Sequence, residues 1–413
     1  MSSSNLVGVT YAPEAVYGVK DTPISGVTLE TARFTSESLS GTPTTVESAA
    51  IRTDRMSGGL VSVGLEVGGA LDFELASDTF FDDFFEGAMM SAWVAAQTIA
   101  ATDVTLTPDP ADDQKATLVI TGDFSTIGAA VGDVIQLLPV AGSPITLTVI
   151  TVTSTTELVV ATKRGELAIV GDTMDVVKSA YLDIGTSSDG RSFLIAKAYK
   201  DVLHDAGTDE HSQTYLGSLV SSFNITAEYG AIVTGNFGTL GNGYIQEVGP
   251  SYEQQVVAGG GTVNPAGTSN PLNASIDVPV VTTDGESTTF CIESFSIDFS
   301  NGLDPSNCIG KIEPIAYTLG TAAVGISTSI YLSDTSYNAF MQKKLSQVPL
   351  SMTFTMLNSD GGYAFSLQAV QLSFPDPASG GQNQQTMIEA AGSAKVGPNN
   401  ESAIRIWKLE GDQ

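Results

Sequence analysis

The sequence predicts a mainly β protein with two tandem β-sandwich domains, each with one flanking helix, and a small inserted all-β module. Three observations lead to this prediction. Segments such as 61–75 alternate between apolar and hydrophilic residues, which is the period of a half-buried strand. The same order of elements recurs in the second half of the chain. Charged residues make up only 15% of the chain and hydrophobic residues 42%, which suits large packed cores and argues against disorder.

The clearest strand covers residues 61–75, where apolar residues occupy every second position on one face. Such alternation places that face against a core and leaves the other face, which includes acidic residues, in contact with water. A helix start follows at 77–79 (Ser-Asp-Thr), because these side chains cap the free amide groups of a first helical turn. Apolar side chains then recur at helical spacing and predict a buried stripe. The stripe consists of Phe81, Phe84, Phe85 and Met89.

This order of elements returns later in the chain. Residues 324–332 alternate, and 333–335 (Ser-Asp-Thr) repeat the helix start. An Asp-Gly turn also recurs, at 187–195 and at 358–367, and predicts a hairpin in each copy. Three matches in the same order favour an internal duplication over chance similarity. The apolar stripe predicted for the second helix consists of Tyr337, Phe340, Met341 and Leu345.

Changes in composition divide the chain into segments. The first residues are irregular and contain several Tyr and Pro, which predicts an arm that packs on another surface. Short apolar runs separated by Gly, Pro and Asp, with Phe124 as the one aromatic residue, predict the inserted module. A stretch rich in Gly, Pro, Asn and Ser predicts a linker. The segments are an N-terminal arm (1–30), a first sandwich domain (31–94 and 179–246), the inserted module (95–178), the linker (247–286) and a second sandwich domain (287–413).

The charge of the chain restricts its partners. Against 46 acidic residues there are 17 basic ones, which gives a net charge of −29. A phosphate-binding surface needs clustered Lys and Arg, and the sequence has no such cluster, so we expect the protein to repel nucleic acid. The first residues lack the pattern of a signal peptide, and no apolar run is long enough to cross a membrane. Cys291 and Cys308 lie on either side of a turn that contains Gly, Pro and Asn, so they could be cross-strand neighbours that pair. Without an export signal, we expect reduced, packed thiols instead.

The residue types needed for catalysis are scarce. Only His204 and His211 could act as a general base or a histidine metal ligand, and a solvated loop is the simpler interpretation of their segment. The glycine-rich run 259–261 lacks the Lys and the helix of a phosphate-binding loop, and Asp109, Asp112 and Asp113 lack calcium-loop spacing. We therefore expect no catalytic residue, no cofactor and no metal site.

Several stretches of the sequence resemble the tail tube (major tail) proteins of long-tailed bacteriophages. They cover most of the chain outside the inserted module and the linker, and their combination is more specific than any one of them. Within the inserted module, 131–135 (Val-Gly-Asp-Val-Ile) resembles β modules found in other tail proteins. The stretches are Leu6–Gly18, Glu47–Arg55, Gly69–Leu75 with Phe81–Ala88, Tyr215–Thr226 with Ala231–Gly238, and Ile292–Gly302.

The resemblance implies a structural virion protein that is assembled in the host cytoplasm and forms rings stacked into a hollow tube. It implies six tail tube domains around each channel, so a chain with two such domains forms a trimeric, pseudo-hexameric ring. The implied partners are further copies of the chain and the tape measure, baseplate and terminator proteins of the tail. DNA would pass through the tube during ejection without specific binding, and no membrane would be involved.

An acidic channel wall would keep DNA from adhering, because like charges repel over roughly 8 Å at physiological salt. The channel-lining candidates are Glu66, Asp72, Glu74, Glu228 and Asp298. The rival interpretation is that these residues solvate an outer face. Two other functions stay open at this point, namely a secreted or surface-layer β-rich structural or adhesion protein and a carbohydrate-active β enzyme. The first lacks an export signal and the second lacks clustered aromatics beside a carboxylate pair.

Overall fold

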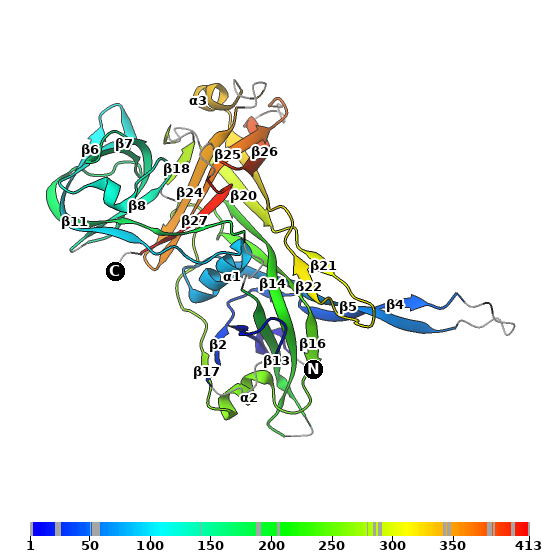
Figure 1. Ribbon diagram of the computed structural model, residues 1–413. Helices are drawn as coiled ribbons and strands as arrows, with labels where there is room; N and C mark the ends of the chain where they lie inside the picture. Colours follow the sequence, from blue (N-terminus) through cyan, green and yellow to red (C-terminus); the bar gives the residue numbers. More distant parts are fainter. Residues whose placement is uncertain are drawn as a thin grey trace.

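The computed structural model consists mainly of β-strands, with a six-stranded barrel on one side of the molecule and a long hairpin projecting from the other (Figure 1). This confirms the mainly β fold class with its small all-β module. Among the described residues, no helix has the length and apolar content needed to cross a membrane. The structure describes residues 3–20, 26–49, 51, 58–140, 142–186, 191–204, 207–278, 280–283, 286–287, 291–341, 344, 348–377, 382, 385–397 and 401–411.

The strands outside the barrel form two copies of one pairing pattern. In the first copy, β5 pairs with β4 and β15, β14 pairs with β15, β13 and β16, and β13 pairs with β1. In the second copy, β23 pairs with β20 and β26, β25 pairs with β26, β24 and β27, and β24 pairs with β18. All of these pairs are antiparallel, and the corresponding strands follow one another in the same order along the chain.

The strands of the first copy are β1 (Val7–Pro13), β4 (Ser40–Glu47), β5 (Leu60–Glu74), β13 (Phe193–Leu203), β14 (Glu210–Glu228), β15 (Thr234–Gly241) and β16 (Gly243–Gln246). Those of the second copy are β18 (Val280–Thr283), β20 (Ile292–Ser300), β23 (Ala323–Tyr331), β24 (Leu350–Asn358), β25 (Gly361–Ser373), β26 (Met387–Lys395) and β27 (Ile404–Leu409). The accessory elements are η1 (Ser4–Leu6), β2 (Thr28–Thr31), β3 (Ser36–Glu37), β12 (Ala180–Asp183), β17 (Thr262–Asn264), β19 (Glu286–Ser287), β21 (Asp304–Ser306) and β22 (Ala316–Thr318).

Helix α1 (Thr79–Met89) lies at the centre of the molecule (Figure 1). It begins at Asp78, whose side chain accepts a hydrogen bond from the amide of Phe80. Every member of the predicted apolar stripe is buried there, with Phe81, Phe84 and Phe85 each 0% exposed. The ring of Phe85 contacts rings of both copies, with centroids 5.4 Å from Phe223 and 5.2 Å from Tyr363. One helix therefore supplies the core of both sandwiches.

The acidic side chains of α1 also connect the two copies. Asp82 accepts hydrogen bonds from Tyr363 at 2.9 Å and from Lys408 at 2.6 Å, both in the second copy. Asp83 accepts from Tyr11 at 3.1 Å and from Arg191 at 2.9 Å, both on the side of the first copy. Burial raises the pKa of both Asp82 and Asp83 above its usual value, although their basic partners oppose that shift.

The second helical segment differs from α1. It consists of α3 (Asp334–Ser336), which is capped by Ser333, and a π-helical turn, η3 (Tyr337–Met341). Phe340 is buried against Phe374, but Tyr337 is 50% exposed and Met341 is only partly buried. The prediction of Tyr337 as a core residue is therefore wrong, because the π-helical turn does not keep the 3.6-residue spacing on which the predicted stripe depended. Leu345 lies outside the described residues.

The inserted module is a closed barrel whose strand order is β10-β7-β6-β11-β8-β9. Its interior is filled with aliphatic side chains and Phe124, which is 2% exposed. The two ends of the insertion meet, because Val94 and Tyr181 exchange backbone hydrogen bonds of 2.9 and 3.1 Å. The barrel consists of β6 (Gln97–Asp109), β7 (Asp112–Ile120), η2 (Phe124–Ile127), β8 (Val134–Pro139), β9 (Ile145–Val152), β10 (Glu157–Ala161) and β11 (Ile169–Lys178).

The barrel is packed firmly on the second copy. Val134 contacts the buried Trp407 of β27, and Val280 of β18 packs against barrel residues. Arg405 forms an ion pair with Asp183 at 2.7 Å and a second with the barrel residue Asp133 at 3.3 Å, and Asp133 is 2% exposed. Buried charges of this kind are stable only while all partners are present, so the barrel is held in one position.

Four other expectations differ from the structure. The predicted arm 1–30 contains β1, which pairs with β13 and buries Val9 and Tyr11. The predicted linker contains helix α2 (Tyr252–Ala258), which packs on the first copy through Tyr252 and Val256. Cys291 and Cys308 are free, as expected, but they are exposed rather than packed.

The fourth difference concerns the repeated turn. The strands flanking 187–190 do not pair with each other, since β12 pairs with β27 and β13 pairs with β1 and β14. The true counterpart of the β24–β25 hairpin is β13–β14, whose ladder ends at Leu203 and Glu210. Residues 187–190 themselves lie outside the described residues. Asp-Gly pairs are common in tight turns of many kinds, so their match across the copies did not identify corresponding hairpins.

We predict that replacing Phe85 with Ala lowers the free energy of unfolding by about 3–5 kcal/mol, because it removes a ring that both sandwiches contact. Urea denaturation of the purified subunit measures the loss. Tyr337→Ala is the matched control and should cost within about 0.5 kcal/mol, since that ring is half exposed. Equal losses in the two variants would contradict a shared core around α1.

Candidate channel-facing surface

A continuous sheet face crosses both copies of the pattern. Residues 222–228 of β14 pair with 294–300 of β20, so the sheet of the first copy continues into the second. The sheet order through this junction is β5-β15-β14-β20-β23-β26. Directly opposed residues in antiparallel strands lie on the same face, so the pairing registers define which side chains share a surface.

Three rows of opposed residues cross this sheet, and their side chains are almost all small and polar or acidic. The first row is Asp72, Asn236, Asn224, Asp298, Gly325 and Ser393. The second is Glu74, Thr234, Thr226, Ser296, Ser327 and Ala391. The third is Glu228, Ser294, Ser329 and Glu389. Lys395, near the outer end of β26, is a basic residue beside these rows.

Hydrogen bonds along and between strands fix several of these side chains. The amide of Asn224 donates to Asp298 across the junction at 2.6 Å, and Thr226 donates to Asn224 at 3.1 Å. The hydroxyls of Ser296 and Ser327 are 2.8 Å apart. Ser36 of β3 donates to Asp72 at the first-copy edge of the sheet. A surface of mutually bonded hydroxyls and amides offers few free donors to a phosphate group.

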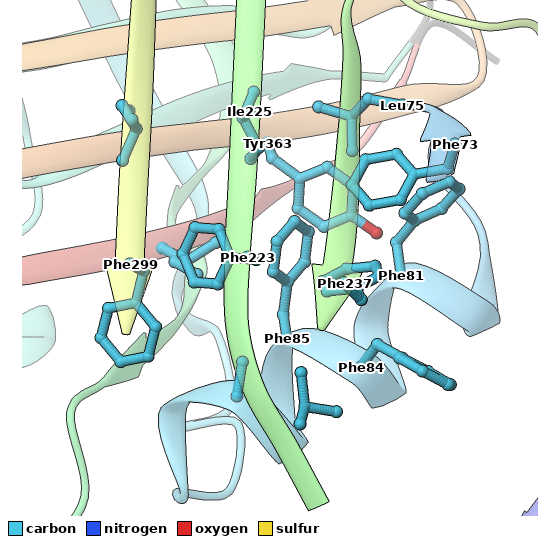
Figure 2. Close-up of a cluster of buried hydrophobic side chains, with 14 of the residues drawn as sticks. Phe73, Leu75, Phe81, Phe84, Phe85, Phe223, Ile225, Phe237, Phe299 and Tyr363 are labelled. Carbon is cyan, nitrogen blue, oxygen red and sulfur yellow. The ribbon is translucent and has the colours of Figure 1, made fainter. Parts of the chain in front are cut away.

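The opposite side of the same strands packs on the aromatic core. Phe223, Phe237 and Phe299 alternate with the polar residues along β14, β15 and β20 and point toward α1 (Figure 2). Phe223 and Phe299 stack across the junction with centroids 5.0 Å apart. Farther along β20, the ring of Phe295 stacks on the ring of Phe354 in β24, which belongs to the second layer, and their centroids are 4.1 Å apart.

The polar rows and the barrel lie on opposite sides of the molecule. Because Phe295 and Phe354 face each other across the core, the outer face of β20 is directed away from the outer face of β24. The barrel covers the outer side of the second layer through Val134 and Trp407. One side of the subunit is therefore a smooth polar sheet and the other is the inserted module.

The predicted acidic residues are divided between two places. Four of them, Asp72, Glu74, Glu228 and Asp298, lie on the polar rows. Glu66 lies instead beyond the end of β15, on the projecting β4–β5 hairpin, where it pairs with Thr42. The sequence prediction missed the more numerous Ser, Thr and Asn positions of the face, although their alternation with buried Phe and Ile could have identified them.

The β4–β5 hairpin is a second unusual surface, and it projects far from the body (Figure 1). The apolar face predicted for 61–75 is buried only from Val67 onward. Farther out, Val61 is 58% exposed and Val63 52%, and Val46 of β4 is 54% exposed. A paired strand with uncovered apolar side chains on this scale is typical of a contact with another molecule.

Comparison with known proteins gives one informative result. No curated protein matches the chain. A family model described as "Phage tail tube protein" matches residues 4–394, which include the first copy of the sheet pattern, the barrel, the polar rows and the second copy up to β26. The chain therefore belongs to the phage tail tube protein family and is a structural tail protein.

Proposed function

We propose that this chain forms rings that stack into a hollow tube, with the polar sheet face lining the channel through which phage DNA is ejected. The observation that supports this most is the continuous sheet across both copies, with neutral polar and acidic residues on one face. DNA binds to proteins largely because Lys and Arg side chains replace the counterions around its phosphates. A wall without such side chains gives DNA no reason to adhere, so the DNA slides past it. At a net charge of −29 the whole subunit adds to that repulsion.

The duplication supports a ring of three chains. A subunit in which two copies of one pattern already join head to tail provides two of the segments of a ring. The family resemblance implies six segments, so three chains complete a pseudo-six-fold ring. The contact between copies is heterologous, and such contacts close into rings or continue as filaments.

In such an assembly, the projecting hairpin would contact an adjacent ring and the barrel would lie on the outer surface of the tube. The uncovered apolar side chains of β4 and β5 need a partner, and an adjacent ring of the same protein is the one we propose. The barrel, on the far side from the polar rows, would decorate the outside of the tube. Tape measure, baseplate and terminator proteins would contact the tube's interior and its two ends.

We predict that the purified protein assembles into hollow tubes with three chains per ring. Electron microscopy of the assembled material, followed by reconstruction, counts the chains and locates the barrel. Six chains per ring would contradict the proposed role of the duplication. Monodisperse single particles at every concentration and salt tested would contradict the tube itself.

We predict that tubes still form, with a smaller outer diameter, when residues 95–178 are replaced by a short Gly-Ser linker. The linker can be short because Val94 and Tyr181 are hydrogen-bonded neighbours. The deletion uncovers Trp407 and Val280, so Val280→Thr is included to limit the exposed apolar area. A folded deletion variant that no longer forms tubes would show that the barrel takes part in ring contacts.

We predict that replacing Asp72, Glu74 and Asp298 with Lys converts the repelling wall into one that binds DNA. Tubes should still form, because these side chains point away from the core, whereas DNA delivery should slow or fail, most severely at low salt. Infection assays and co-sedimentation of DNA with purified tubes provide the measurements. Asp172→Lys, on an exposed barrel strand, is the matched control. Normal infection by the triple variant would show that this face does not govern DNA passage.

A further inference from the structure

The junction between the two copies has a leading and a trailing side. The trailing side is the second half of β14, residues 222–228, and the leading side is β20, residues 294–300. Seven opposed pairs form this ladder without interruption, from Ser222 with Ser300 to Glu228 with Ser294. Because the pattern is duplicated, the first copy must have its own leading strand, and the second copy its own trailing strand.

Both of these counterparts are edges without a strand partner among the described residues. The leading strand of the first copy is β4, together with the short β3, and each pairs only with β5. The trailing strand of the second copy is the end of β25, where Leu372 and Ser373 pair only with β26. An unpaired sheet edge exposes backbone donors and acceptors that can bind another strand.

The sequences of the two trailing strands give their register. Ser222-Phe223 in β14 corresponds to Ser373-Phe374 at the end of β25. Phe223 packs on Phe85 of α1, and Phe374 packs in the same way on Phe340 of the second helical segment, with centroids 6.5 Å apart.

The leading strands can be aligned as well. Val67 of β5 and Val324 of β23 are buried counterparts, and they pair with Gly41 and Phe299. The next residue outward is therefore Thr42 in β4 and Ser300 in β20. Since Ser300 faces Ser222 in the junction within the chain, Thr42 should face Ser373 of another copy.

We propose that the end of β25 in one copy of the chain pairs with the outer edge of β4 in a second copy, with Ser373 opposite Thr42. This inference rests on the proposed ring and identifies the joint that closes it. The new joint repeats the β14–β20 junction, so the polar rows continue from chain to chain.

The joint between chains is built to be weaker than the joint within a chain. Asn224 and Thr226 in β14 correspond to Pro375 and Pro377 after β25. Proline has no amide hydrogen, so each removes one donor from the ladder, and proline at an edge strand hinders pairing with stray strands. The prolines therefore keep separate subunits from joining prematurely, and the joint becomes stable only when the ring closes and neighbouring rings add their contacts.

A cross-linking experiment tests the location of the joint. In a background with Cys291→Ser and Cys308→Ser, the double variant Thr42→Cys, Ser373→Cys is assembled into tubes and oxidised. Directly opposed residues have their Cβ atoms within disulfide reach, so covalent multimers should appear on a non-reducing gel. Each single variant, and the pair Thr42→Cys with Asp360→Cys at the other end of the β24–β25 hairpin, should give no multimers beyond dimers.

The cross-linking outcomes separate the joint from the proposed function. Tubes that form normally but give no multimers would overturn the proposed joint and leave the tube function standing. A chain that forms neither tubes nor rings would overturn the joint together with the proposed function.

Restoring the missing donors tests the role of the prolines. Pro375→Asn with Pro377→Thr installs the residues of the first copy. We expect assembly to begin at a roughly tenfold lower protein concentration, because two regained hydrogen bonds together strengthen the joint by about that factor in affinity. Light scattering over a concentration series measures the onset, and Pro110→Thr in an exposed barrel turn is the matched control. An onset equal to that of the unmodified protein, or a higher one, would overturn the proposal that these prolines weaken the joint.

Discussion

The ladder between β14 and β20 is the interaction on which the rest of the structure depends. It joins a sheet of the first copy to a sheet of the second, and it thereby fixes the positions of the polar rows and the aromatic core relative to each other. The strand β14 can take part because it changes sheets along its length. Its first half pairs with β13 and β16, and its second half pairs with β15 and β20. Gly217, at φ +59, lies at this change, where a side chain would also collide with Asn242.

The two copies share one pairing pattern but not one helix geometry. Helix α1 contacts strands of both copies at once, because Phe85 on its aromatic face packs on Phe223 of the first copy and on Tyr363 and Phe365 of the second. The second helical segment packs on strands of its own copy through Phe340. One helix, α1, therefore serves the cores of both copies. The corresponding segment of the second copy does not have to fill a shared core, and it forms a short helix and a π-helical turn instead of a regular helix.

The polar face shows how a surface can be inert without being highly charged. Its rows contain mostly Ser, Thr and Asn, and several of their donors bond to other members of the rows. The acidic residues stand mostly toward the ends of the rows rather than in the middle. Crowding many carboxylates on one sheet would cost stability through mutual repulsion, because like charges on opposed residues destabilise a strand pair. Spacing them among neutral groups keeps the sign of the surface and avoids that cost.

The sequence alone determined those features that depend on local pattern. Period-two alternation identified strands such as β5, helical spacing identified the buried Phe residues of α1, and composition separated the barrel from the rest of the chain. These features are encoded by neighbouring residues, so no knowledge of distant contacts is needed to read them. The same reasoning placed Asp72, Glu74, Glu228 and Asp298 on hydrophilic strand faces.

Only the tertiary structure decided which of those faces form one surface. Asp72 and Asp298 share a row through β15 and β14, and strand pairing between distant segments cannot be derived from their local sequence. The same limit explains the other differences. The alternation of 61–75 continues into a hairpin where Val61 and Val63 stay exposed, and the strands on either side of 187–190 pair elsewhere. Alternation specifies that a face is apolar, whereas burial depends on what the fold brings against it.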